Sequence, residues 1–366
     1  MIIYLVMCLI SILLVYKYDK SNIIIYYLLA ALPFILISGI RYGVGTDYFY
    51  RYVTDIQKIN LNIPVPDMEL GFKLLIKLCL LFSKNYNLFF FITSVIANCI
   101  IFYNIKKDSN NKVLSILIYF IAGFFFQSMN MIRQFIAISL IFSSYKWILN
   151  FSKKNLIFLV ICSIVAFSIH TSSIIAIFIL LCLKFIKKPF NYLTLTITIV
   201  LLILLSNPIY HLTKLIVSNT RFNVYLVGAY AHGDVSYLNL ILNLLIYMYM
   251  YFIYSKSKIK NTKLAIFYLN CQSITTLLFA LTSNHVLFSR IAYYFSIFQI
   301  LSIPYFISYF DSYKIKFKDL VIRKKTLYIS IIILFGATFT YTNIIHNDNQ
   351  PLPYRTIFNK GDSNER

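Results

Sequence analysis

Arginine is sparse and unevenly placed in this 366-residue chain, where lysine supplies most of the positive charge. Five of the eight arginines stand at the edge of an apolar segment or in a long polar one: Arg41, Arg51, Arg133, Arg221 and Arg290. An arginine near hydrocarbon is costly, and its planar fork of donors suits a phosphate better than the point charge of lysine. We therefore expect Arg41, Arg133 and Arg290 to bind a pyrophosphate. The alternative for each is an interfacial arginine whose charge reaches water.

Two residues are candidates for a general base. Asp47 closes the segment Arg-Tyr-Gly-Val-Gly-Thr-Asp, in which two glycines let the backbone turn and bring Asp47 back toward Arg41. A carboxylate at the edge of the hydrocarbon must be paired or solvated. His170 stands in Phe-Ser-Ile-His-Thr-Ser-Ser between two apolar blocks, and an imidazole exchanges a proton near neutral pH. The sequence leaves open which of the two is the base, and a structural role for His170 is the alternative.

Three further residues are candidates for contact with a glycan. Tyr48 belongs to a run of tyrosines that suits sugar stacking or an interfacial belt, and Glu69 and Arg221 are the other two. The segment Pro353-Tyr354-Arg355 is either part of a disordered end or a cap over an outer cavity. His, Asp, Glu and Cys residues show no spacing typical of metal ligands, and no nucleotide-binding glycine pattern is present. We therefore expect no metal and no cofactor.

The composition indicates which elements must position these residues. Sixty per cent of the residues are hydrophobic and 13% are charged, whereas soluble proteins usually contain about 25% charged residues. The apolar residues form blocks of about 15–20, the length that a helix needs to cross the hydrocarbon layer. The sequence predicts an all-α polytopic membrane protein of about 12 transmembrane helices, with residues 1–366 as one integral membrane domain. These spans are expected near residues 2–16, 23–40, 86–104, 113–129, 133–150, 155–169, 172–186, 191–209, 237–254, 263–283, 291–310 and 327–345.

The distribution of charge predicts the orientation of these spans. Most of the 34 basic residues lie in or beside alternate short loops, which the positive-inside rule places in the cytoplasm. Both termini, two long loops (about 41–85 and 210–236) and a C-terminal tail (346–366) are then outside. The net charge of +22 is interpreted as an orientation signal and not as a nucleic-acid surface. The cytoplasmic loops are 17–22, 105–112, 151–154, 187–190, 255–262 and 311–326.

Two segments need a separate interpretation. Residues 70–82 are apolar but contain two lysines, which predicts an amphipathic helix at the membrane interface. Residues 155–186 form either two short spans that meet at His170 or a broken, re-entrant hairpin.

Several motifs, in this order, resemble the EpsG-like family of bacterial polysaccharide polymerases. The first is the segment from Arg41 to Tyr48, followed by Glu69-Leu-Gly-Phe. Met-Ile-Arg-Gln-Phe-Ile-Ala around Arg133 resembles the family's Arg-Gln helix start, and the segment around His170 resembles its His-Ser/Thr segment. Ser289-Arg290 with Tyr293, and Pro353-Tyr354 near the end, complete the resemblance. No resemblance is found between residues 187 and 284.

The resemblance implies a Wzy-type polymerase of O-antigen, capsule or exopolysaccharide. Such a glycosyltransferase moves a growing glycan from undecaprenyl pyrophosphate onto the next lipid-linked oligosaccharide repeat unit, at the outer face of the bacterial plasma membrane. Its partners would be the lipid-linked oligosaccharide, membrane lipids, a chain-length regulator and a flippase, without nucleic acid. Arg41, Arg133 and Arg290 would hold the pyrophosphate, and Asp47 or His170 would take the proton of the acceptor hydroxyl.

Three alternatives remain, and the sequence cannot separate the first of them from the polymerase. A ligase that moves finished glycan to another acceptor would share the donor and the architecture. A transporter of polysaccharide or lipid-linked sugar would usually show repeats and charges near the middle of the membrane. A sugar acyltransferase could use His170 as a base, but would normally take its acyl donor from the cytoplasm.

Overall fold

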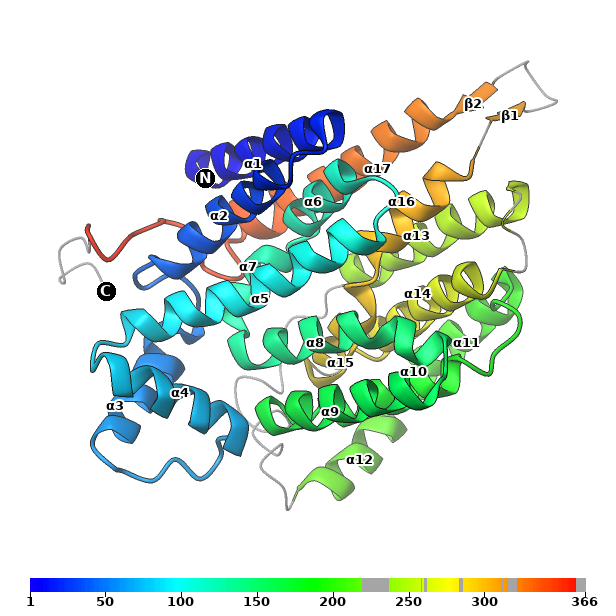
Figure 1. The fold of residues 1–366 in the computed structure, drawn as a ribbon. Helices are drawn as coiled ribbons and strands as arrows, with labels where there is room; N and C mark the ends of the chain where they lie inside the picture. The colour runs from blue at the N-terminus through cyan, green and yellow to red at the C-terminus, as the bar shows by residue number, and fades with distance from the viewer. Residues whose placement is uncertain are drawn as a thin grey trace. The chain divides into compact units, whose positions relative to one another are not determined.

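The computed structural model describes residues 1–218, 237–257, 259, 262–282, 286–310, 312–314 and 321–359. The chain forms two compact units, the first made of residues 1–143, 161–171 and 328–359, and the second of the described parts of 144–160 and 172–327. Helices account for 79% of the structure, which confirms an all-α protein (Figure 1). The prediction of a single membrane domain is not tested by this division.

The first half of the chain supplies ten α-helices and one π-helical turn among its described residues. Their bounds are α1 (Ile2–Ser21), α2 (Ile24–Gly39), η1 (Tyr48–Val53), α3 (Thr54–Asn60), α4 (Leu70–Phe82), α5 (Asn87–Asp108), α6 (Lys112–Ile121), α7 (Phe124–Asn130), α8 (Ile132–Leu149), α9 (Lys153–Ile169) and α10 (Ser173–Leu183).

The described residues of the second half add seven α-helices, another π-helical turn and a short antiparallel strand pair that the sequence did not predict. Their bounds are α11 (Tyr192–Leu204), α12 (Ser206–Val217), α13 (Tyr237–Lys256), α14 (Lys263–Leu281), α15 (Val286–Ser296), α16 (Gln299–Ser308), β1 (Ser312–Lys314), β2 (Val321–Arg323), α17 (Lys324–Phe339) and η4 (Thr340–Ile345).

Each predicted span coincides with a helix or a bent pair of helices. Among the described residues, five helices are long and apolar enough to cross a membrane: α1, α5, α13, α14 and α17 continued by η4. The number rises to eight if three bent pairs, α6–α7, α11–α12 and α15–α16, each count as one span. The helices α2 and α10 are apolar but only 16 and 11 residues long. A multi-pass membrane protein is therefore confirmed, whereas the number of about 12 spans stays a prediction.

The core of the first unit is built where α1, α2, α5 and α6 pack side by side (Figure 1). Phe34 is fully buried, and its ring lies 5.4 Å from the ring of Phe102 and 5.0 Å from that of Phe125. Buried polar groups find partners on neighbouring helices, since Tyr27 Oη donates to the carbonyl of Phe102 at 2.7 Å. Such bonds stabilise an apolar bundle, because an unpaired polar group there has no water to bond with and its burial costs free energy.

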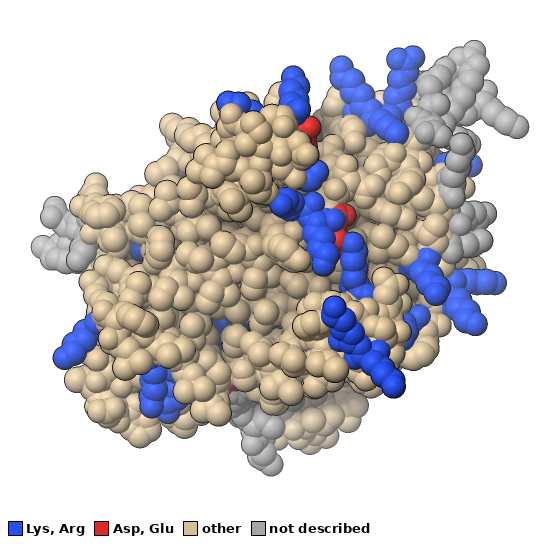
Figure 2. Space-filling model, viewed as in Figure 1, with Lys and Arg blue, Asp and Glu red and all other residues tan. Residues whose placement is uncertain are grey.

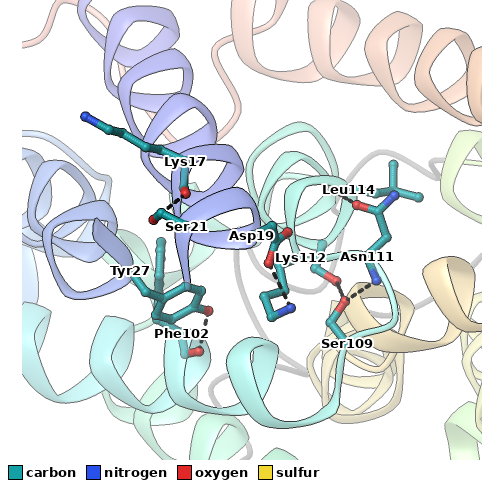
Figure 3. Close-up of polar contacts among 10 residues, drawn as sticks. Lys17, Asp19, Ser21, Tyr27, Phe102, Ser109, Asn111, Lys112 and Leu114 are labelled. Atoms are coloured by element: carbon teal, nitrogen blue, oxygen red, sulfur yellow. Dashed lines mark hydrogen bonds and ion pairs between the residues drawn. The ribbon is translucent and has the colours of Figure 1, made fainter. Parts of the chain in front are cut away.

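One end of the first unit is basic. Lys112 Nζ lies 3.0 Å from Asp19 Oδ1, and Asn111 Nδ2 donates to Tyr328 Oη at 3.4 Å. These contacts join the last turn of α1, the start of α6 and the first part of α17, and the close-up shows the Lys112–Asp19 pair (Figure 3). The segments around Asp19 and Lys112 were both expected on one side of the membrane, and that topology stays a prediction.

The other end of the first unit holds the N-terminus and the C-terminal segment. Tyr4 Oη donates to the carbonyl of Pro351 at 3.0 Å, and the amide of Tyr42 donates to the carbonyl of Arg355 at 2.9 Å. Tyr4 and Asp19 are 15 residues apart on one helix, which separates the two ends by about 22 Å. Which end faces the cytoplasm stays a prediction.

The surface agrees with a membrane environment. Most of the face in Figure 2 carries no charged side chain, and basic residues far outnumber acidic ones there. The predicted helix at residues 70–82 is confirmed with those bounds as α4, which exposes Leu70, Leu74, Leu78 and Leu81 along one side. This leucine stripe suits an interfacial helix, but its place in the membrane stays a prediction.

In the second unit, three amide side chains bond to one another in the interior. Gln299 Nε2 donates to Asn243 Oδ1 and to Gln272 Oε1, each at 2.9 Å, and Gln272 Nε2 donates to Asn243 Oδ1 at 3.1 Å. All three residues are buried. They join α13 and α14 to the start of α16, beside the 41° bend between α15 and α16. The bend is therefore supported by side-chain hydrogen bonds as well as by packing.

Candidate functional site

Glu69 is the centre of a buried group of charged residues in the first unit. Its Oε2 lies 2.9 Å from Arg133 Nη1, and its Oε1 lies 3.2 Å from His170 Nδ1. The backbone amide of Thr171 donates to the same Oε1 at 3.3 Å. We call Glu69, Arg133, His170 and Thr171 the Glu69 cluster. Only 4% of the Glu69 side chain is exposed, against 16% for Arg133 and 12% for His170. The arginine and histidine side chains are therefore more accessible than the carboxylate.

The ends of three helices bring the Glu69 cluster together. Glu69 caps the N-terminus of α4, Arg133 is the second residue of α8, and His170 directly follows the last residue of α9. Gly71 permits this approach, because a Cβ there would lie 2.3 Å from Ser168 Oγ. The Arg133 guanidinium also lies over the ring of Phe72, 5.8 Å from its centre, a distance typical of cation–π contact.

The electrostatics keep Glu69 ionised. Burial alone would raise the pKa of Glu69, but the hydrogen bond from His170 and the charge of Arg133 outweigh it and lower the pKa to about 2. The carboxylate therefore balances the charge of Arg133 at neutral pH. Protonation of His170 would then give the Glu69 cluster a net positive charge.

The Glu69–His170 contact also sets the chemistry of the imidazole. In a neutral histidine, one ring nitrogen carries the proton and the other accepts one. A carboxylate beside Nδ1 favours the proton at that nitrogen, which makes Nε2 the basic atom. The Glu69 carboxylate thus holds a base, His170 Nε2, and a cation, Arg133, close to one another.

A second buried acid lies in the same unit. Asp55 Oδ2 is 3.2 Å from Arg51 Nε, one helical turn earlier. Burial raises the pKa of the Asp55 carboxyl, and the charges of Arg51 and Arg133 oppose that rise. Asp55 was not singled out from the sequence, because a charge pair at this spacing is common on exposed helices.

Arg41 lies inside the protein with only 1% of its surface exposed. Its guanidinium donates to the carbonyl of Ser38 and, at 2.9 Å, to the carbonyl of Met129, and it lies 4.9 Å from the centre of the Phe90 ring. Burial lowers the pKa of Arg41 to about 10, so the group is still a cation at neutral pH. Both of its terminal nitrogens donate to protein oxygens, whereas the buried Nε has no hydrogen-bond partner among the described residues. We interpret Arg41 as an internal support of the loop that it begins.

Tyr48 is likewise a core residue, which corrects its expected contact with a glycan. Its ring is 1% exposed and stacks on the Phe90 ring at 4.2 Å with an interplanar angle of 8°. A sugar cannot reach a face that another ring covers. Of the three expected glycan contacts, Glu69 lies within the Glu69 cluster, and Arg221 falls outside the described residues.

Asp47 is partly exposed and is placed through its backbone. Its amide donates to Asn130 Oδ1 at 3.1 Å, and the hydroxyl of Thr46 donates to the same oxygen at 2.7 Å. Asn130 was not singled out from the sequence, although it stands directly before the Met-Ile-Arg-Gln-Phe-Ile-Ala segment used for the family resemblance.

The described part of the C-terminal segment is held against the rest of the first unit by hydrogen bonds, and for that part the alternative of a disordered end is wrong. Tyr354 Oη donates to the carbonyl of Ile37 at 2.9 Å, and the amide of Ile357 donates to the carbonyl of Ile40 at 2.9 Å. The segment thus lies along the loop that begins at Arg41. Its function as a cap over a cavity stays a prediction.

Arg290 belongs to α15 of the second unit. Its expected convergence with Arg41 and Arg133 therefore stays a prediction. Among the described residues, no group of three or more His, Cys, Asp or Glu side chains could hold a metal ion.

Comparison with known proteins gives one match. The family model described as the EpsG family matches residues 24–356, which cover most of the chain. No curated protein and no solved structure matches the chain. The matched region includes every member of the Glu69 cluster, as well as Asp47 and Arg290.

Proposed function

Because the chain belongs to the EpsG family, a family of polysaccharide-biosynthesis membrane proteins, we propose that it polymerises lipid-linked oligosaccharide repeat units. The growing glycan would be transferred from undecaprenyl pyrophosphate onto a hydroxyl of the next unit, at the outer face of the bacterial plasma membrane. The observation that carries the proposal is the Glu69 cluster, in which a carboxylate holds an arginine and a histidine together.

The proposed step needs a base and a cation, and the Glu69 cluster has both. The acceptor hydroxyl gives its proton to His170 Nε2 while its oxygen bonds to the anomeric carbon of the growing glycan. The bond from that carbon to the pyrophosphate oxygen breaks, and its electron pair leaves with the lipid pyrophosphate. Arg133 stabilises the charge that develops on this leaving group. The glycosyl pyrophosphate itself supplies the driving force, so the step calls for no nucleotide.

The position of the Glu69 cluster suits a lipid-bound substrate. It forms at the N-terminus of α4, whose exposed leucines would lie against the acyl region of an interface. Arg133 is the second residue of α8, so its charge adds to the partial positive charge at the N-terminus of that helix. In the proposal, Arg41 supports the adjoining loop.

The experiment uses the purified chain in lipid vesicles with an undecaprenyl-pyrophosphate-linked repeat unit as the only sugar substrate. Wild-type protein should produce a ladder of polymers, and Arg133→Lys should lower its rate about tenfold to a hundredfold because lysine lacks the fork of donors. Arg323→Lys is the matched control, since Arg323 is exposed on β2. Transfer to lipid A core without a ladder would point to the ligase, and passage of unlinked units across the vesicle would point to the transporter.

A further inference from the structure

Asn130 bonds to three separate segments of the first unit. Its Oδ1 accepts hydrogen bonds from the Thr46 hydroxyl at 2.7 Å and the Asp47 amide at 3.1 Å. Its Nδ2 donates to Asn349 Oδ1 at 3.3 Å, and its backbone carbonyl accepts from Tyr52 Oη at 3.1 Å. One side chain therefore ties the loop after α2 to the C-terminal segment, and its backbone ties both to η1.

The place of Asn130 in the chain connects these bonds to the Glu69 cluster. Asn130 is the last residue of α7, and Arg133 follows as the second residue of α8. Between the two helices, Met131 has φ −97° and ψ 55°, outside the helical region. The break turns the chain so that Asn130 contacts the loop while Arg133 reaches Glu69. A shift of Asn130 would therefore move Asp47 and Arg133 together.

The C-terminal segment closes the loop from the other side. The amide of Gly45 donates to the carbonyl of Gln350 at 3.2 Å, and Gly45 has φ +103°, a conformation that favours glycine. A Cβ at Gly45 would lie 3.6 Å from Asn130 Oδ1. Asn347 folds the C-terminal segment back on itself, because its Oδ1 accepts from the Leu352 amide at 3.1 Å. The loop is thus held between Asn130 and the C-terminal segment.

We infer that Asn130 is a positioning residue that fixes Arg133 against the loop after α2, and that residues 347–357 belong to the site because they hold Asn130 and its loop. The inference rests on the proposed glycosyl transfer. Asn130 touches no reacting atom in it, and acts by holding the cation Arg133 in place relative to His170. Misplacement of such groups by about 1 Å can cost about a hundredfold in rate.

The test is a kinetic comparison of Asn130→Ala, Asn349→Ala and the control Asn110→Ala in vesicles with the lipid-linked repeat unit. Asn130→Ala should lower kcat about 10- to 100-fold and change KM for the donor less than about threefold, since positioning acts on the transition state. Asn349→Ala removes one hydrogen bond and should lower kcat about threefold to tenfold. Asn110 is exposed in the loop before α6, and its replacement should leave kcat within about twofold.

The outcomes separate this inference from the function on which it rests. A wild-type protein that makes no polymer would contradict the function itself. A polymerising wild type with unchanged kcat in Asn130→Ala, or with a change in KM alone, would overturn the positioning role and leave the function intact. If Asn130→Ala does not reach the membrane, Asn349→Ala decides, and an unchanged kcat there would reject the inference.

Discussion

The carboxylate of Glu69 lies 3.2 Å from His170 Nδ1 although the two residues are about a hundred positions apart in the chain. The contact joins the start of α4 to the end of α9 and places the imidazole beside a group that is ionised at neutral pH. It gives His170 a defined orientation, which a base needs and a solvent-exposed histidine lacks. The stability and the chemistry of this part of the protein should therefore depend on the same carboxylate.

Replacement of Glu69 by Gln should destabilise the protein in a pH-dependent way. The pKa of Glu69 is lowered from 4.5 to about 2, so its ionised form stabilises the fold above the unfolded value of 4.5. That contribution, about 3 kcal/mol at most, is lost as the pH falls from 4.5 toward 2. The melting temperature of Glu69→Gln should lie below that of wild type at pH 7, and the two should approach one another near pH 3. A difference that grows on acidification would contradict the ionised carboxylate.

Replacement of Arg41 by Lys should reduce stability more than turnover. Lysine cannot donate to the carbonyls of Ser38 and Met129 together, as the guanidinium does. The loss of a charge-assisted hydrogen bond should cost about 1.5–3 kcal/mol of folding stability. Thermal unfolding of the detergent-purified protein measures this cost. If the folded fraction of Arg41→Lys has lost kcat as severely as Arg133→Lys, Arg41 contacts the substrate and its role as an internal support is wrong.

Replacement of Gly71 by Ala should disturb the junction of α4 and α9. The added Cβ would lie 2.3 Å from Ser168 Oγ and 2.8 Å from the Ser168 carbonyl oxygen, so backbone must move. Overpacking of this kind usually costs about 1–3 kcal/mol. Gly336→Ala is the matched control, because nothing lies within 4 Å of a Cβ there and alanine favours a helix by about 0.5–1 kcal/mol. Equal melting temperatures for the two variants would show that the junction is not tightly packed.

The orientation of the first unit can be tested by cysteine labelling of intact cells, in a background without the six native cysteines. Tyr50 is highly exposed at the end that holds the C-terminal segment, and Asn110 is exposed at the basic end. The positive-inside rule predicts that an impermeant reagent labels Tyr50→Cys from outside and labels Asn110→Cys only after the cells are opened. The reverse pattern would place the Glu69 cluster on the cytoplasmic side.

The sequence predicted the positions of the helices well because apolar blocks determine them. The apolar stretches ending at Ile169 and beginning at Ser173 correspond to α9 and α10, and the break between them holds His170, as the hydroxyl-rich segment indicated. The number of membrane crossings could not be predicted in the same way. Bends of 41–64° divide three spans into short helices, and apolar composition alone does not reveal a bend.

The charged residues of the Glu69 cluster were named from the sequence, but their contacts with one another were not predicted. His170 and Arg133 were singled out from residue type and position, but their common partner Glu69 was expected to contact a glycan. A pair separated by 64 residues, as Arg133 and Glu69 are, leaves no periodic pattern in the sequence. The burial of Arg41 was missed for a related reason, since its main partners are backbone carbonyls, which any residue type provides.

The most direct test of the central claim compares the initial rates of glycan elongation by His170→Ala and Asp47→Asn in vesicles, at equal amounts of folded protein. Loss of the base should lower kcat about 10²- to 10⁴-fold, so His170→Ala should yield single repeat units where wild type yields a ladder. Asp47→Asn should retain a ladder, because Asn130 holds this residue through its backbone amide. A normal ladder from His170→Ala, together with single units from Asp47→Asn, would contradict the assignment of His170 as the base.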